Sequence, residues 1–165
     1  KKILKFLFAV ILCEGAGIIG SFFTTPAIGS WYVALPKPSF NPPNWIFAPV
    51  WTLLFFLMGI SLYLIWNEKQ KGKNIQTAVL IFFQQLFLNI LWSALFFGMH
   101  NPALAFVEII VLWFAILMTI FYFAKISKTA PAISPIPSMG LLRLHPKPLH
   151  LAFNRLIVNS NNNLK

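Results

Sequence analysis

Acidic residues and cysteine are almost absent from this chain. Three of its 165 residues are acidic and one is a cysteine. A single cysteine cannot form a disulfide framework, and the acidic residues show no paired-carboxylate motif. The three histidines have no metal-site spacing with a carboxylate or with the thiol. Nucleotide-binding loops and nucleophile elbows are missing too, so we expect no metal site and no cofactor.

Charged residues of both signs are scarce, at 10% of the chain against 58% hydrophobic residues. An ordinary soluble domain carries about 25% charged residues. A core of this size cannot hide so much apolar surface, so we expect lipid to surround it. The net charge of +10 would suggest nucleic acid in a soluble protein. Here the cations flank apolar runs, as in membrane proteins, so the expected partner is the bilayer and not nucleic acid.

Four apolar runs predict an all-α integral membrane protein with four spans. The helices are expected at about 3–24, 47–66, 77–98 and 103–124. At about 1.5 Å per residue the first run spans roughly 30 Å, and it is too long for the apolar part of a signal peptide. We therefore expect it to be retained.

The cations alternate between segments. Three precede the first run, Lys37 alone follows it, three lie in the second connection, none in the third and six after it. This pattern predicts that the N-terminus and the second connection lie on the cytoplasmic-type side.

Small residues in the first run, including Ala16 and Gly20, have the spacing that favours close approach between membrane helices. Glu14 lies in the middle of this run and should face the interior. Both a ligand or proton site and a satisfied interior group remain open for it.

Prolines and aromatic residues crowd the connection after the first run, at 25–46. The prolines remove backbone donors and restrict φ, so we expect an irregular loop that acts as a lid. The aromatic residues interleaved with them are Trp31, Tyr32, Phe40, Trp45 and Phe47. Rings with a polar edge settle where an apolar core meets water or headgroups.

Two of the predicted helices carry aromatic or polar stripes at steps of four, three and four. On the second helix the stripe consists of Trp51, Phe55, Met58 and Leu62. On the third helix it consists of Gln85, Asn89, Trp92 and Phe96. Each spacing places its members on one helix face. Amides surrounded by lipid need partners, which are either a hydrogen-bond network inside the bundle or a bound ligand.

These motifs resemble the TspO/MBR family, which includes the translocator protein or peripheral benzodiazepine receptor. The resemblance rests on W-Y-x-x-L-x-K-P-x-x-x-P-P from Trp31 to Pro43 and W-x-F-x-x-V-W from Trp45 to Trp51. It continues on the third helix in Gln85-Leu86-x-Leu88-Asn89-x-x-Trp92-Ser93, followed by Phe96-Phe97. It covers roughly residues 3–130.

The resemblance implies a five-helix bundle whose first loop covers a pocket for porphyrins and other hydrophobic ligands, with sterols in some members. The residues that it places in this pocket are Tyr32, Trp51, Phe55, Asn89 and Trp92. Binding of a tetrapyrrole by a sensor or regulator is the function that it implies. The alternatives are light- and oxygen-dependent porphyrin breakdown, with Trp51 as the catalytic indole, and transport of porphyrin or sterol. A homodimer is a further expectation.

The segment 131–165 departs from the family pattern, because a fifth helix with a tryptophan is expected there. If its codons are read one base later, Met139-Gly140 must contain a tryptophan codon. Pro135-Ile136-Pro137 can then encode Pro-Tyr, and Pro146-Lys147-Pro148 can encode Leu-Asn, at the family's spacings. We hypothesise a frameshift near Ala130, and the alternative is a genuine irregular tail. The DNA sequence decides between them. As written, the four helices should expose a groove and bind ligand poorly.

Overall fold

The described part of the chain is almost entirely helical. The computed structural model describes residues 2–35, 44–69 and 71–133, and these residues contain no strand. The helical elements are α1 (Lys2–Ile28), α2 (Trp31–Ala34), η1 (Asn44–Ile46), α3 (Phe47–Lys69), α4 (Gln76–Ser93), η2 (Ala94–Gly98), α5 (Pro102–Ile126) and α6 (Ala130–Ile133). Four of these stretches are long and apolar enough to cross a membrane, with η2 continuing α4. The prediction of an all-α membrane fold with four spans is therefore confirmed.

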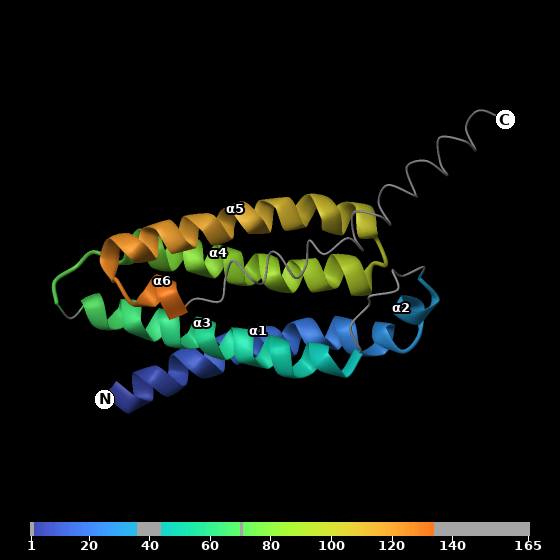
Figure 1. The fold of residues 1–165 in the computed structure, drawn as a ribbon, viewed down its shortest axis with the longest axis horizontal. Coiled ribbons are helices and arrows are strands. Elements are labelled where there is room, and N and C mark those ends of the chain that lie inside the picture. The colour runs from blue at the N-terminus through green and yellow to red at the C-terminus, as the bar shows by residue number, and fades with distance from the viewer. Residues whose placement is uncertain (1, 36–43, 70, 134–165) are drawn as a thin grey trace.

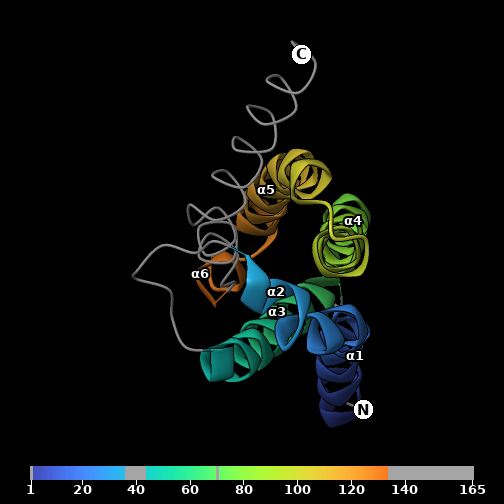
Figure 2. The same ribbon diagram turned by 90° about the vertical axis from the view of Figure 1, so that its right-hand side faces the viewer.

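The long helices run alongside one another and enclose a ring when viewed along the bundle (Figures 1 and 2). Helix α1 packs against α3 and α4, and α4 packs against α5. The short helix α6 contacts both α3 and α5. It lies between α3 and α5, toward the end of the bundle that carries the N-terminus (Figure 1). The expectation of an exposed groove beside the four spans stays a prediction. Residues 134–165, the rest of the expected irregular tail, lie outside the described residues.

Helix boundaries differ from the expected ones at several ends. Helix α1 continues to Ile28, α2 forms at Trp31–Ala34 and η1 at Asn44–Ile46, so the expectation of an irregular loop over all of 25–46 was wrong. The physical reason is that the run of prolines begins only at Pro36, after α2 has ended. In the last turn of α1, the Ser30 hydroxyl donates to the carbonyl oxygen of Pro26 at 2.8 Å. Residues 36–43 lie outside the described residues.

Helix α5 begins with a strong N-terminal cap. The Asn101 side-chain oxygen accepts a hydrogen bond from the Leu104 amide at 3.1 Å, and Pro102 occupies the first turn. A proline is tolerated there because its missing N–H would have had no helical partner. The tight connection between the third and fourth spans follows from this cap.

Glycine allows α1 and α3 to approach each other closely. A Cβ atom on Gly59 would lie 2.7 Å from the Val10 Cα and 3.1 Å from the Ala9 carbonyl oxygen. The close approach expected at Gly20 is also present, since a Cβ atom there would lie 3.2 Å from the Ser93 hydroxyl of α4. In lipid, where the hydrophobic effect does not drive helices together, small residues allow the close van der Waals packing that does. Glu14, expected to face the interior, is half-buried.

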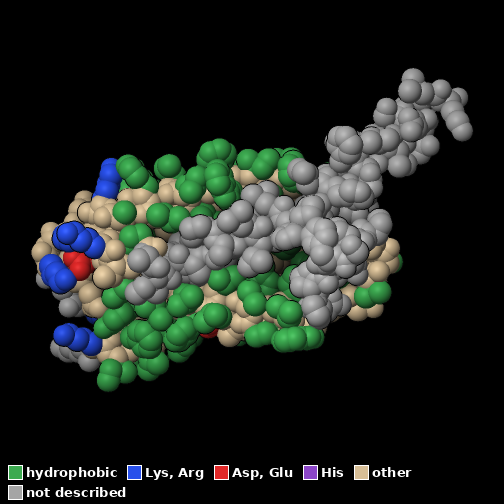
Figure 3. Space-filling model, in the orientation of Figure 1, with side chains coloured by type: hydrophobic (Ala, Val, Ile, Leu, Met, Phe, Trp, Pro, Cys, Tyr) green, Lys and Arg blue, Asp and Glu red, His purple; other side chains and the backbone are tan. Residues whose placement is uncertain are grey.

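The outer surface is apolar along the flanks and basic at one end. Large hydrophobic side chains such as Leu80, Phe87, Phe114 and Phe121 are exposed on the flanks. On the face shown in Figure 3, lysine side chains gather at the end that carries the N-terminus and the α3–α4 connection. An apolar flank with a charged end is the arrangement that a lipid bilayer stabilises.

Candidate functional site

Five aromatic residues pack together at the end of the bundle opposite the N-terminus. We call them the aromatic cluster: Trp31, Tyr32, Trp92, Phe96 and Phe97. The Trp92 and Phe96 rings stack with centroids 5.0 Å apart and planes 6° from parallel. Phe97 meets Trp92 edge to face at 5.9 Å and lies 5.8 Å from the Tyr32 ring. Tyr32 and Trp92 are therefore brought into one cluster, with Phe97 between them.

A local change of helix type brings Phe97 into this cluster. The η2 segment is a π-helix, and beyond it the Met99 amide donates to the Ala94 carbonyl at 2.8 Å, five residues earlier. This wider turn places residues five apart on one face, so Trp92 contacts both Phe96 and Phe97. Phe97 was quoted in the family motif but is not on the predicted stripe, whose spacing assumes a regular α-helix. Single π-turns occur frequently at functional sites.

Tyr32 joins the start of α3 to the cluster. Its side chain is buried, and its ring meets the Phe47 ring edge to face at 6.4 Å. Burial raises the pKa of the Tyr32 phenol, which moves its ionisation still further from physiological pH. A neutral phenol can present a hydroxyl donor without bringing a charge into the membrane.

His100 completes the aromatic end, and sequence reasoning missed it. Its ring stacks on Trp31 with centroids 4.5 Å apart. It has a positive φ of 51°, a left-handed conformation that few residues other than glycine adopt. The tight turn before Pro102 was a signal for such a conformation, but the contact with Trp31 joins segments that are far apart in the sequence.

The two amides on α4 are fully buried and only partly satisfied. The Asn89 Nδ2 group donates to the Gln85 carbonyl at 2.8 Å and lies 3.4 Å from the Gln85 Oε1 atom. The Gln85 Nε2 and Asn89 Oδ1 atoms have no hydrogen-bond partner among the residues that the structure describes. The 2.8 Å contact with the Gln85 carbonyl oxygen requires a donor, so it fixes the Asn89 amide with its nitrogen on that side. Within the described residues, the contacts of these two side chains therefore leave one amide donor and one amide acceptor unused.

Trp51 and Phe55 belong to a different cluster, on the side of α3 that faces α1. Phe55 is buried, and its ring fills the space beside Gly17, where an added Cβ would come within 2.6 Å. Trp51 is half-buried at the edge of this cluster. Met58 and Leu62 are fully buried, so all four stripe residues pack on this cluster. The five predicted pocket residues are thus divided between two clusters, with Asn89 buried on α4.

Comparison with known proteins identifies the family of this chain. The model of the TspO/MBR family matches residues 9–140. The chain belongs to the TspO/MBR family.

Its relatives include archaeal, bacterial and animal members. The chain is 44% identical over 134 residues to "Tryptophan-rich protein TspO" of Archaeoglobus fulgidus, covering 81% of this chain and 86% of that protein. It is 42% identical over 130 residues to the protein of the same name from Chlorobaculum tepidum, covering 79% and 82%. The human "Translocator protein" is 37% identical over 95 residues, which cover 56% of this chain and 55% of the human protein. This TspO/MBR chain is therefore an integral, multi-pass membrane protein.

Proposed function

We propose that this TspO/MBR protein binds a planar hydrophobic ligand, a tetrapyrrole, and acts as a sensor or regulator of it. The observation that carries the proposal is the pair of unused amide groups on Gln85 and Asn89. Leaving a buried polar group without a partner is destabilising by about 1–3 kcal/mol for each group. A bound ligand with a polar edge would satisfy both groups, as a tetrapyrrole can through its propionates and ring N–H groups.

The aromatic cluster supports a flat ligand. Trp92 lies one turn after Asn89 on α4, so the indole and the amide share a helix face. Flat macrocycles stack on indole and phenyl faces, whereas the saturated rings of a sterol do not. In this proposal Tyr32 and the 25–46 segment form the lid, and the ligand lies against Asn89 and Trp92. Trp51 and Phe55, which the family likeness also suggests as contacts, belong to the separate cluster on α3. A sterol and a second copy of the chain remain the further partners that the family suggests.

The division between clusters favours binding over chemistry. Porphyrin breakdown would require the Trp51 indole against the ligand, and Trp51 lies outside the aromatic cluster that holds Trp92. Binding at the Asn89 and Trp92 face does not depend on Trp51. We therefore propose ligand recognition as the primary function.

The test replaces the Asn89 amide with an apolar side chain of similar size. Protoporphyrin is titrated into the purified full-length protein and followed by the shift of its main absorption band. We expect Asn89→Leu to weaken binding about tenfold through the loss of one hydrogen bond to the ligand. The same substitution should raise the thermal stability of the ligand-free protein, because it removes an unused buried acceptor.

Gln84→Leu is the matched control, since Gln84 is an exposed amide on the same helix. It should change neither affinity nor stability measurably. Unchanged porphyrin affinity in Asn89→Leu, or weaker binding explained by a loss of stability, would contradict the proposal.

The positions of the lysines support an orientation of the protein in the membrane. We propose that the end carrying the N-terminus and the α3–α4 connection faces the cytoplasmic-type side. Among the residues that the structure describes, the lysines belong to the start of α1, the α3–α4 connection and the segment around the end of α5. These segments share one end of the bundle (Figure 1). Retention of lysine-rich segments in the cytoplasm is the rule that supports this orientation.

A further inference from the structure

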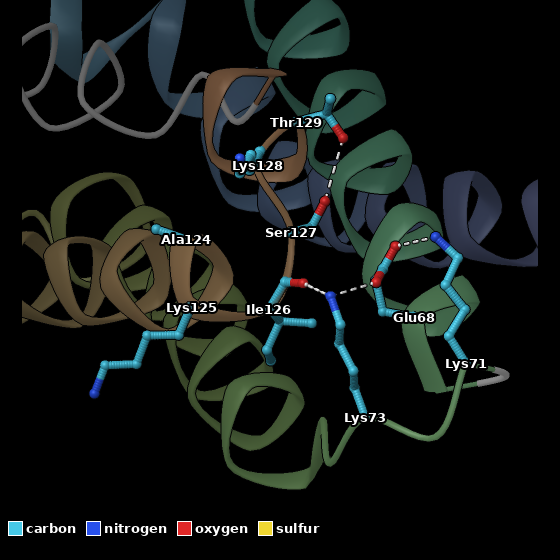
Figure 4. A pocket seen from close by; sticks show the side chains of 9 residues that line it. All are labelled: Glu68, Lys71, Lys73, Ala124, Lys125, Ile126, Ser127, Lys128 and Thr129. Atoms are coloured by element: carbon cyan, nitrogen blue, oxygen red, sulfur yellow. Dashed lines mark hydrogen bonds and ion pairs between the residues drawn. The ribbon is translucent and has the colours of Figure 1, made fainter.

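A hollow lies at the lysine-bearing end, far from the aromatic cluster. Its volume is about 470 Å³, and its walls come from the α3–α4 connection, the last turn of α5 and the α5–α6 connection. Figure 4 shows the side chains that line it. Four lysines lie along this lining, Lys71, Lys73, Lys125 and Lys128, with Glu68 as the single carboxylate. The hollow is therefore strongly basic.

Glu68 ties two of these lysines to the wall. Its carboxylate oxygens lie 2.7 Å from the Lys71 Nζ and 2.8 Å from the Lys73 Nζ. Lys73 also donates to the carbonyl oxygen of Ile126, at the end of α5. As Figure 4 shows, these contacts link the α3–α4 connection to the end of α5 and hold two walls of the hollow together.

The other two lysines have no carboxylate partner in the part of the chain that the structure describes. The Lys125 Nζ lies 4.1 Å above the Phe121 ring, and Lys128 is exposed. On either side of Lys128 in the chain, the hydroxyls of Ser127 and Thr129 lie 3.2 Å apart and add two possible donors. The Lys125 side chain points away from them, as Figure 4 shows. Lysine ammonium groups and hydroxyls that line one hollow make a favourable setting for a phosphate group.

A second hollow extends the first toward the apolar flank. It has a volume of about 380 Å³ and shares Lys73, Lys125 and Ile126 with the first. Its other walls include Ala78 at the start of α4 and Tyr122 near the end of α5. About one turn further along α4 and α5, Leu80 and Met118 are exposed apolar side chains on the flank. The two hollows together thus join a basic site to a lipid-facing surface.

We infer that these joined hollows bind an anionic phospholipid, with its phosphate-bearing headgroup against the lysines that line them, Lys125 and Lys128, and its glycerol region against Tyr122 and Ala78. A free phosphate would use only the first hollow, whereas an amphiphile uses both. Basic pockets between membrane helices on the cytoplasmic side bind anionic headgroups, and that leaflet carries anionic lipids. This inference is independent of the proposed tetrapyrrole binding.

The test measures lipid retention by the purified full-length protein. Phosphatidylglycerol or phosphatidylcholine is titrated into the protein in neutral detergent, and bound lipid is counted by native mass spectrometry. We expect one phosphatidylglycerol to bind clearly more tightly than phosphatidylcholine. The double variant Lys125→Gln, Lys128→Gln should lower that affinity about twenty-five-fold, from about fivefold for each lysine. Higher salt should weaken it as well.

The matched control is the double variant Lys2→Gln, Lys5→Gln, which removes two exposed lysines at the same end of the bundle. It should keep the parent affinity within about twofold. Equal binding of the two lipids, or unchanged phosphatidylglycerol binding in the Lys125 and Lys128 variant, would overturn the inference. Inorganic phosphate is the third arm, and thermal stabilisation by phosphate as large as that by the lipid would instead assign the hollow to a free anion.

Discussion

The two ends of this bundle are built from different interactions. At one end, five aromatic rings contact one another, and Tyr32 and Trp92 are both buried. At the other end, the walls are joined by ion pairs of Glu68 and by one lysine bonded to a helix carbonyl. The lysines of these ion pairs are largely exposed, with side chains 66% and 48% accessible.

This difference suggests that one end of the bundle stabilises the fold and that the other end recognises charge. Close ring packing is weak for each atom pair but sums over many contacts, and it does not depend on salt. Exposed ion pairs are screened by salt, and each contributes little. We therefore expect the aromatic end to hold the fold and the lysine end to provide an adaptable surface for anions. Three substitutions test this contrast, from the largest expected effect to the smallest.

Removing a ring from the aromatic cluster should have the largest effect. Trp92→Ala should lower the free energy of unfolding by about 3 kcal/mol, because a buried indole leaves a cavity between α4 and its neighbours. The control is Trp45→Ala, since Trp45 is 72% exposed and should change stability by less than about 0.5 kcal/mol. Thermal unfolding in detergent measures both. Equal losses in the two variants would show that the cluster is not a centre of stability.

Adding a methyl group where α1 and α3 meet, in the middle of the bundle, should have an intermediate effect on the free energy of unfolding. Gly59→Ala places a methyl group 2.7 Å from the Val10 backbone, which cannot move aside as a side chain could. We expect a loss of about 2 kcal/mol from overpacking. Gly15→Ala is the control, because nothing lies within 4 Å of its added Cβ. It should be neutral or gain up to about 1 kcal/mol of helix propensity. The order of the two melting temperatures checks the prediction, and a reversed order refutes it.

Breaking the ion pairs at the lysine end should have the smallest effect. Glu68→Gln removes the charge that Lys71 and Lys73 share, and it should lower the melting temperature slightly at low salt. At about 1 M salt, where the screening length is about 3 Å, the parent and the variant should melt at the same temperature. A loss of equal size at low and high salt would mean that Glu68 stabilises the protein through packing instead of charge.

The number of spans and the buried faces could be predicted from the sequence. Apolar run length and helical spacing are local properties, so they placed Met58 and Leu62 on a buried face and Asn89 with Trp92 on one stripe. The family likeness was recognisable because its motifs consist of rare residues, tryptophan and proline, at fixed spacing. The hypothesis of a frameshift near Ala130 stays a prediction, and the DNA sequence decides it.

The arrangement of the helices and the contacts between distant segments required the structure. A hydrophobic stripe shows which face of a helix is buried but not which helix covers it, because in lipid many faces are equally apolar. The π-turn that brings Phe97 into contact with Trp92 replaces regular α-helical hydrogen bonds. The spacing of residues in the sequence did not predict it. Lys73 bonds to Ile126, and Trp31 stacks on His100, across gaps in sequence that local patterns cannot bridge. Spacing along one helix could therefore be read in advance, whereas the partners across the bundle depend on how closely particular side chains fit together.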